Sequence, residues 1–181
     1  MITGKKVVLH NKRLTHARNE YSWHTDAELT ALDAAPKLTI SFSRYFMDYA
    51  MELRLTNSAS RSFAIETPEG KHIGKIGYYA IDEVNGEAEL GIMIGDRDYW
   101  GKGYGSDAVT TLIDYIFRKT NLKRIHLKSL EWNIRAHQCF HGCGFTICGR
   151  RVSDVYSFIL MEITRRQWEQ RQKNTEGASG E

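Results

Sequence analysis

Cysteine is scarce in this sequence, and the few cysteines do not form a disulfide pattern. The chain has three, Cys139, Cys143 and Cys148, all in one short stretch. An odd number of clustered cysteines does not build a disulfide framework, and free thiols are typical of proteins from reducing compartments. This scarcity favours a cytoplasmic protein.

Long hydrophobic runs are also missing. No apolar stretch approaches the roughly 18 residues that a membrane-spanning helix needs. The first residues include Lys5 and Lys6, at the place where a signal peptide would have its apolar stretch. We therefore expect a cytoplasmic location and no membrane partner.

Neither sign of charge dominates the chain. Lys and Arg number 25 and Asp and Glu number 22, so the formal net charge is only +3. Such a small charge does not produce the strong positive field of nucleic-acid-binding proteins, and we expect no nucleic-acid partner. Hydrophobic residues make up 41% of the chain, which places it among globular rather than disordered proteins.

The length of 181 residues fits one ordinary domain that buries its own core. No linker or repeat divides the chain, and we predict a single domain over residues 1–170. Residues 171–181 contain no large apolar side chain, so we predict a disordered tail there.

Hydrophobic periodicity predicts a mixed α+β order of elements. A β-rich run at 5–11 precedes a helical pattern over 15–55, which Pro36 interrupts. Strands between 62 and 94 form an antiparallel meander, because Asn85-Gly86 is a strong hairpin signal. The remaining pattern gives helices at 103–120 and 133–144, and strands at 124–130, 145–148 and 155–163.

A glycine-rich turn between a strand and an amphipathic helix is the most informative segment. It reads Trp100-Gly101-Lys102-Gly103-Tyr104-Gly105-Ser106. The first amides of a helix have no intrahelical partner and carry partial positive charge, and glycines let a phosphate approach them closely. The turn therefore predicts a site for a phosphate-bearing ligand. The alternative is that the glycines only connect a strand tightly to a helix.

The spacing of these glycines excludes two common phosphate-binding motifs. The ATP-binding P-loop needs Gly-x-x-x-x-Gly-Lys-Ser/Thr, which does not occur in the chain. The dinucleotide fingerprint needs Gly-x-Gly-x-x-Gly, whereas Gly105 comes one position too early. ATP and NAD are therefore not the expected ligands.

With its surroundings, the turn resembles the core of the GNAT superfamily of N-acetyltransferases. Members carry a strand, then Arg/Gln-x-x-Gly-x-Gly/Ala leading into a helix, then a strand, then a helix that begins with Asn and ends in Gly-Phe. Here Asn133 begins that last helix and Gly144-Phe145 ends it. Trp100 departs from the pattern, because it stands where the family has Arg or Gln. The Tyr-Trp-Gly-Lys-Gly-Tyr form is similar to the branch of ribosomal-protein and spermidine acetyltransferases.

The resemblance covers residues 5–164 and implies both a fold and an activity. The implied fold has α/β/α layers, with a mixed, mostly antiparallel sheet of about six or seven strands and about four flanking helices. The implied enzyme moves the acetyl group of acetyl-CoA to a primary amine, by direct attack in a ternary complex. The acceptor stays open between a protein or peptide α-amine, an amino sugar and a polyamine. Family members often dimerise, which leaves a homodimer open as well.

The resemblance also implies how acetyl-CoA is held. The amides of the glycine turn hold the pyrophosphate, and the strand at 92–94 pairs its backbone with the pantetheine arm as an added strand would. Asn133 either hydrogen-bonds the arm or caps its helix. The implied cofactor-binding residues are Ile92, Met93, Ile94, Trp100, Gly101, Lys102, Gly103, Tyr104, Gly105, Ser106, Asn133, Ala136 and Phe140.

Two catalytic positions are implied on the strand before the turn. Glu89 stands where family members often carry a base that acts through water, and an ordinary surface glutamate is the alternative. A backbone N–H near Met93, freed where the strand splays, is the candidate oxyanion donor. Phe140 stands at the position of the usual tyrosine acid and has no proton to give. A catalytically silent coenzyme-A-binding sensor or partner module is therefore the alternative to an enzyme.

The histidines and cysteines after Asn133 do not make a metal site in this interpretation. On a helix, His137 and His141 lie nearly opposite Cys139 and Cys143, so the four side chains do not converge on one ion. We expect no metal and assign the cysteines to the core. The aromatic residues of the helical segment either line an acceptor pocket or pack in the core: Tyr21, Trp23, Tyr45, Phe46 and Tyr49.

Overall fold

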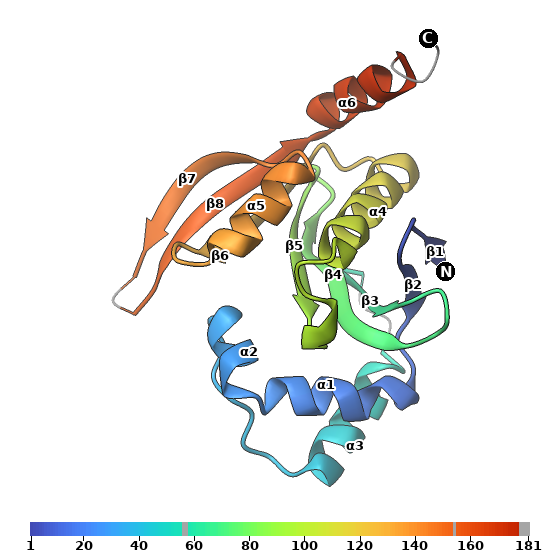
Figure 1. The fold of residues 1–181 in the computed structure, drawn as a ribbon, viewed down its shortest axis with the longest axis vertical. Coiled ribbons are helices and arrows are strands. Elements are labelled where there is room, and N and C mark those ends of the chain that lie inside the picture. Colours follow the sequence, from blue (N-terminus) through green and yellow to red (C-terminus); the bar gives the residue numbers. More distant parts are fainter. Residues whose placement is uncertain (56–57, 154, 178–181) are drawn as a thin grey trace.

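The computed structural model describes residues 1–55, 58–153 and 155–177. A central sheet runs through this part of the chain in the order β1-β2-β3-β4-β5-β6-β8-β7 (Figure 1). All neighbouring strands are antiparallel except β5 and β6, which are parallel. The strands are β1 (Ile2–Thr3), β2 (Val8–Asn11), β3 (Ser60–Glu66), β4 (His72–Asp82), β5 (Glu87–Ile94), β6 (Arg124–Leu130), β7 (Thr146–Val152) and β8 (Ser157–Thr164).

Helices lie against both faces of the sheet. The sheet residues that pack against α4 belong to the large core cluster, whereas Met93 of β5 points the other way and packs against Trp23 of α1 and Leu29 of α2. The helical elements are η1 (Leu14–His16), α1 (Ala17–His24), α2 (Ala27–Leu32), α3 (Phe42–Glu52), η2 (Arg97–Tyr99), α4 (Tyr104–Lys119), α5 (Ile134–Gly142) and α6 (Arg165–Gly177). The mixed, mostly antiparallel architecture confirms the predicted fold class.

The sheet has eight strands in the described residues, where the sequence predicted six or seven. The first residues fold back as β1, with Ile2 opposite Leu9 of β2. The connection between them is held by Asp107 of α4, whose carboxylate accepts the backbone N–H groups of Lys6 at 2.7 Å and Val7 at 3.1 Å. A long-range carboxylate contact of this kind leaves no pattern in the local sequence.

The described residues also form more α-helices than the four that were predicted. Asp26 separates α1 from α2, because its side chain accepts the N–H groups of Glu28 and Leu29, both at 3.0 Å. This settles the cap of α2 on Asp26 rather than Thr25. Pro36 lies between α2 and α3, as the helical break predicted.

Within the described residues, α6 continues past position 171, where the sequence predicted the start of a disordered tail. Two side chains attach this helix to α4: Trp168 Nε1 lies 2.6 Å and Gln172 Nε2 3.0 Å from Asp114 Oδ1. Arg171 donates to the carbonyl of Gly142 at 3.0 Å. Polar anchors replace the large apolar side chains whose scarcity suggested disorder, and the helix runs to Gly177. Residues 178–181 of the predicted tail lie outside the described residues.

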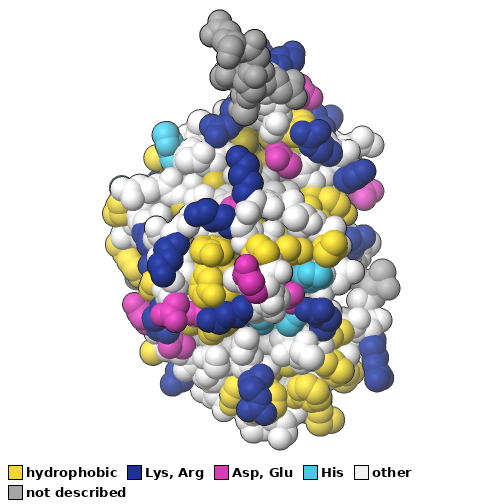
Figure 2. All heavy atoms as spheres, turned by 45° about the vertical axis from the view of Figure 1, so that its right-hand side comes forward, with side chains coloured by type: hydrophobic (Ala, Val, Ile, Leu, Met, Phe, Trp, Pro, Cys, Tyr) yellow, Lys and Arg dark blue, Asp and Glu magenta, His cyan; other side chains and the backbone are white. Residues whose placement is uncertain are grey.

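The apolar stripe of α4 fills the core as its spacing predicted. Val109, Leu112, Ile113, Ile116 and Phe117 are all buried against the sheet. The described helices include none that is long and apolar enough to cross a membrane. In the view of Figure 2, apolar side chains gather at the lower end of the molecule, where α3 exposes Phe46, Met47 and Met51.

A polar layer joins α1 and α3 to the sheet. Glu20 of α1 is 1% exposed and accepts hydrogen bonds from Lys12 Nζ and Tyr49 Oη, both at 2.8 Å. Next to this pair, Lys75 Nζ of β4 lies 2.9 Å from His24 Nε2. Burial lowers the pKa of Lys75, and burial together with that lysine lowers the pKa of His24 to about 4. Neighbouring His72 also has its pKa lowered to about 4, mainly by burial and then by His16.

We expect this layer to make the fold sensitive to mild acid. His24 and His72 stay neutral in the folded chain, whereas in the unfolded chain they take up protons below about pH 6.5. Stability is therefore full above that pH and falls as the pH drops toward 4. Allowing for the partial exposure of both rings, the loss from pH 7 to pH 5 is about 2 kcal/mol, or roughly 4–8 °C in the unfolding midpoint. Calorimetry of the wild type and a His24→Gln/His72→Gln variant measures it, and an equal drop in both proteins contradicts the assignment.

Candidate functional site

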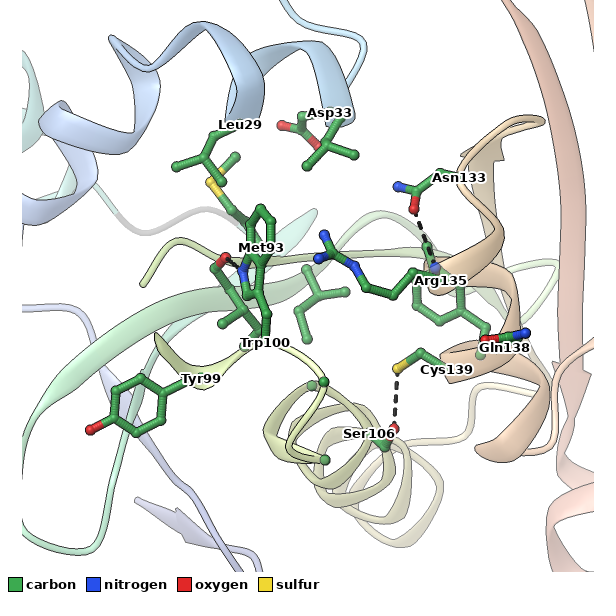
Figure 3. Close-up of a pocket in the computed structure, with 18 residues that line it drawn as sticks. Leu29, Asp33, Met93, Tyr99, Trp100, Ser106, Asn133, Arg135, Gln138 and Cys139 are labelled. Carbon is green, nitrogen blue, oxygen red and sulfur yellow. Dashed lines mark hydrogen bonds between the residues drawn. The ribbon is translucent and has the colours of Figure 1, made fainter. Parts of the chain in front are cut away.

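A cavity opens where β5 and β6 part. The two strands pair only from Glu87↔Arg124 to Glu89↔His126, and beyond that point they diverge. Figure 1 shows β7 and β8 swinging away from β4 and β5 on the far side of this opening. The cavity has a volume of about 440 Å³ and three walls (Figure 3): the end of α2, the edge of β5 with the glycine turn, and the start of α5.

The cavity brings together the residues predicted to bind the cofactor, except Lys102 and Tyr104, which do not line it. It also contains residues that the sequence did not single out. The lining is Leu29, Leu32, Asp33, Ile92, Met93, Ile94, Tyr99, Trp100, Gly101, Gly103, Gly105, Ser106, Asn133, Arg135, Ala136, Gln138, Cys139 and Phe140.

The glycine turn places the N-terminus of α4 at this cavity. Gly101 has φ +68° and Gly103 has φ +82°, a left-handed conformation that glycine adopts at little cost. Gly103 is the N-cap of α4 and supplies no side-chain cap, so the first amides of the helix receive no hydrogen bond from it. Lys6 Nζ donates to the carbonyl of Lys102 at 2.8 Å, which places a second cation beside the turn. The arrangement suits an anionic group.

The edge of β5 exposes alternate backbone groups to the cavity. Just before β5, the carbonyl of Gly86 accepts the N–H of Lys123, the residue before β6, at 2.6 Å. Just after β5, Gly95 donates to the carbonyl of Ile73 in β4 at 3.0 Å. Backbone direction alternates along a strand, so even-numbered residues of β5 face β6 and odd-numbered residues face β4. Ile92 and Ile94 therefore turn their N–H groups into the opening, whereas the N–H of Met93 points toward β4. The N–H groups near Met93 that face the opening are thus those of its neighbours Ile92 and Ile94.

Trp100 closes part of that edge. Its Nε1–H donates to the carbonyl of Ile94 at 2.7 Å, and its ring is stacked by the guanidinium of Arg135, 3.8 Å from the ring centroid. Figure 3 shows Arg135 reaching from α5 across the cavity toward Trp100. Trp100, which departs from the family pattern, thus occupies the carbonyl of Ile94 with its own hydrogen bond. The N–H and C=O of Ile92 and the N–H of Ile94 remain at this edge for a ligand.

The start of α5 forms the opposite wall. Asn133 Oδ1 accepts the N–H of Ala136 at 3.2 Å, so Asn133 caps its own helix. Phe140 is 7% exposed and stacks edge-on with Phe145 at 5.8 Å, so it lines the cavity and fills the core at once. Cys139 Sγ lies 3.3 Å from Ser106 Oγ across the cavity.

The cysteines separate into three environments. Cys143 is buried, as predicted, whereas Cys139 is half-buried in the cavity wall and Cys148 is exposed on β7. The neighbouring Cys143 thiol, and then the Ser106 hydroxyl, lower the pKa of the Cys139 thiol below its ordinary value. No group of three or more metal-ligating side chains occurs among the residues that the structure describes.

Glu89 lies just outside the cavity lining, on the face of the sheet toward α1–α3. Its neighbours Ala88 and Leu90 point into the core with α4, so alternation directs Glu89 to the opposite face, the same face as Met93. Tyr79 Oη donates to Glu89 Oε1 at 3.1 Å. Asp33, at the end of α2, lines the cavity on this side.

The aromatic residues of the first helices do not line the cavity. Trp23 and Tyr49 are buried in the packing between helices and sheet, and Phe46 is exposed on α3. The α2 side of the cavity is formed instead by Leu29, Leu32 and Asp33.

A splayed pair of parallel strands beside a helix N-terminus built from glycines defines the acetyltransferase class that the sequence suggested. The sequence model of the acetyltransferase (GNAT) domain family matches residues 6–146, and the chain belongs to this family of N-acetyltransferases.

Three proteins show the range of similarity. An uncharacterized N-acetyltransferase, p20, from Bacillus licheniformis is 32% identical over 171 residues, which is 85% of this chain and 96% of that protein. A Bacillus subtilis protein named as a ribosomal N-acetyltransferase, YdaF, is 26% identical over 107 residues, covering 56% of this chain and 58% of its own. The spermidine N-acetyltransferase of Vibrio cholerae, solved with CoA and spermine, superposes with a TM-score of 0.81 at 20% identity, covering 90% and 98% of the two chains.

Proposed function

We propose that this N-acetyltransferase uses acetyl-CoA and transfers its acetyl group to a primary amine by direct attack within a ternary complex. The carrying observation is the continuity of one cavity, from the uncapped amides of α4 along the β5 edge to the end of α2. The first part suits a pyrophosphate, the second an extended amide-containing arm, and the third an amine that enters from the α2 side.

Each part of the cavity has a task in this proposal. The amides from Gly101 to Ser106 hold the pyrophosphate, and Lys6 adds charge beside them. The free N–H and C=O groups of Ile92 pair with the arm, and a gap-facing N–H of Ile92 or Ile94 stabilises the oxyanion that develops. The thioester supplies a leaving group that departs without much help, because a thiol has a pKa of roughly 8.5. The reaction therefore does not require a general acid, and Phe140 at the position of the family's usual tyrosine is compatible with it.

Glu89 is the proposed base. It accepts the proton of the acceptor ammonium, directly or through water, and leaves a neutral amine to attack. An α-amine is about a tenth neutral at pH 7, whereas an amine of pKa roughly 10.4 is almost wholly charged. The acceptor classes that we propose are a peptide or protein α-amine, an amino sugar and a polyamine; the structurally similar Vibrio cholerae enzyme was solved with spermine.

Thermal unfolding tests the cofactor assignment. Acetyl-CoA at 100 times its dissociation constant stabilises the fold by about 2.7 kcal/mol, which raises the midpoint by roughly 5–10 °C. ATP and NAD serve as controls and leave the midpoint unchanged. Release of free thiol from acetyl-CoA on addition of an amine then separates an enzyme from a silent coenzyme-A-binding module.

We also expect acetyl-CoA to protect Cys139 from alkylation. Its thiol lines the cavity, and the neighbouring Cys143 thiol lowers its pKa, which favours the reactive thiolate form. Saturating acetyl-CoA should slow the reaction of Cys139 with iodoacetamide about 10-fold or more, as measured by peptide mass spectrometry. Exposed Cys148 is the internal control and should react at an unchanged rate. Equal rates at Cys139 with and without acetyl-CoA place the cofactor elsewhere.

A further inference from the structure

Glu89 is held through only one of its carboxylate oxygens. Tyr79 Oη donates to Oε1 at 3.1 Å, and Lys128 Nζ lies 3.3 Å from the same atom. No hydrogen bond or ion pair joins Oε2 to any residue in the described ranges. The Glu89 side chain is 17% exposed, so water screens its hydrogen bond and ion pair less than those of an ordinary surface pair.

A glycine makes the contact with Tyr79 possible. Tyr79 faces Glu89 in the register between β4 and β5, and Gly91 follows on the same face of β5. A Cβ built on Gly91 lies 3.0 Å from Tyr79 Cε1 and 3.4 Å from Tyr79 Oη. The ring therefore lies over the bare backbone of Gly91, on the side of Glu89 nearer the cavity. Tyr78, its neighbour in the sequence, is 4% exposed and points into the core instead.

Three other charged or titratable side chains lie near Glu89, and none of them forms a described ion pair with it. Arg124 of β6 binds Glu87 and Glu162, both at 2.6 Å, and so is held by two other carboxylates. His126 stands opposite Glu89 in the β5–β6 register, and Asp33 approaches from the α2 side. Lys128 is thus the cation that pairs with Glu89 in the described part of the chain.

We propose that Tyr79 and Lys128 are positioning residues that hold Glu89 through Oε1 and keep Oε2 open to receive the proton of the acceptor ammonium. The tyrosine fixes the direction of the carboxylate, and the lysine holds the same oxygen in an ion pair. The proton passes from nitrogen to Oε2, directly or through one water, and Glu89 then releases it to solvent. This inference rests on the proposed role of Glu89 as base.

A double-mutant cycle tests the inference. Tyr79→Phe and Lys128→Met are each measured in the wild-type and Glu89→Gln backgrounds, with acetyl-CoA and glycylglycine, glucosamine or spermidine as acceptor. Each single change should lower kcat about 5–10-fold and leave KM for acetyl-CoA within about 2-fold. In the Glu89→Gln background neither change should lower kcat further, because the residue through which it acts is gone. Lys128→Arg should recover most of the activity lost in Lys128→Met.

Matched controls use groups of the same kind away from Glu89. Tyr156→Phe removes a hydroxyl next to β8, and Lys119→Met removes an exposed cation at the end of α4; both should keep wild-type kcat. The positioning role is overturned if Tyr79→Phe and Lys128→Met match wild type, or if they cost the same in both backgrounds.

The proposed function fails by different results. A wild-type rate for Glu89→Gln removes the base assignment and the positioning role together. A second result would also remove both assignments: the unfolding midpoint rises with acetyl-CoA, but none of the three amines is acetylated. That result favours the catalytically silent coenzyme-A-binding module. A slow Glu89→Gln enzyme with fully additive losses from Tyr79→Phe and Lys128→Met overturns only the positioning role.

Discussion

Replacing Glu89 with Gln is expected to lower kcat about 10²–10³-fold, the usual loss when a general base is removed. The change is isosteric, and the amide still accepts a hydrogen bond from Tyr79, so the loss reflects the missing proton acceptor. The loss should be larger with spermidine than with glycylglycine, because the amines of a polyamine are less often neutral at pH 7 than an α-amine. Steady-state release of thiol from acetyl-CoA measures both.

The control for this change lies on the same strand. Glu87 precedes Glu89 on the same face of β5, but it is bound by Arg124 at 2.6 Å and lies farther from the cavity. Glu87→Gln should change kcat less than about 2-fold. Similar losses in the two variants would show that Glu89 supports the strand rather than the chemistry.

A large side chain in the glycine turn at Gly105 is expected to weaken acetyl-CoA binding strongly. A Cβ on Gly105 meets Ile94 Cγ1 at 3.7 Å and Cys139 Sγ at 3.8 Å, which are ordinary contacts, so the protein accommodates a side chain. The rest of a leucine then occupies the cavity between α4 and the β5 edge. We expect Gly105→Leu to weaken binding at least about 100-fold, or about 2.7 kcal/mol. The unliganded midpoint should not fall, since leucine favours a helix more than glycine does.

Gly142 provides the matched control. It lies in the last turn of α5, away from the cavity, and a Cβ added there meets nothing within 4 Å. Gly142→Leu should bind acetyl-CoA as the wild type does, by thermal shift and calorimetry. If Gly105→Leu also binds at wild-type affinity, the glycine turn is only a connection and the phosphate lies elsewhere.

The sequence predicted the glycine turn and the helix that follows it well, because both are determined by local residue types. A left-handed backbone at Gly101 and Gly103 requires glycine, and the amphipathic stripe that follows identifies the helix whose amides are used. The side on which Glu89 lies also follows from alternation within one strand. Met93 shows where that reasoning stops, because the direction of its N–H depends on which edge of β5 meets β4. That edge is fixed by long-range pairing, as in the bond between Gly95 and Ile73.

The parts of the site that the sequence missed are set by packing between distant segments. Asp33 follows the last turn of α2 like many exposed residues, and it lines the cavity only because Leu29 packs against Met93. Arg135 reaches Trp100 because α5 starts across the opening from the glycine turn. Neither contact has a local signature. The extra strand β1 has the same origin, in the bonds from Asp107 to the backbone of the preceding segment.

The division of labour between backbone and side chains has a consequence for how this enzyme can diverge. The glycine turn and the β5 edge present backbone N–H and C=O groups, which every residue type except proline possesses. Substitutions other than proline should therefore change little there as long as the glycines keep the turn. The wall at Leu29, Leu32 and Asp33 presents side chains from a short helix outside the sheet. Substitutions confined to α2 should therefore alter this wall of the cavity and leave the glycine turn and the β5 edge unchanged.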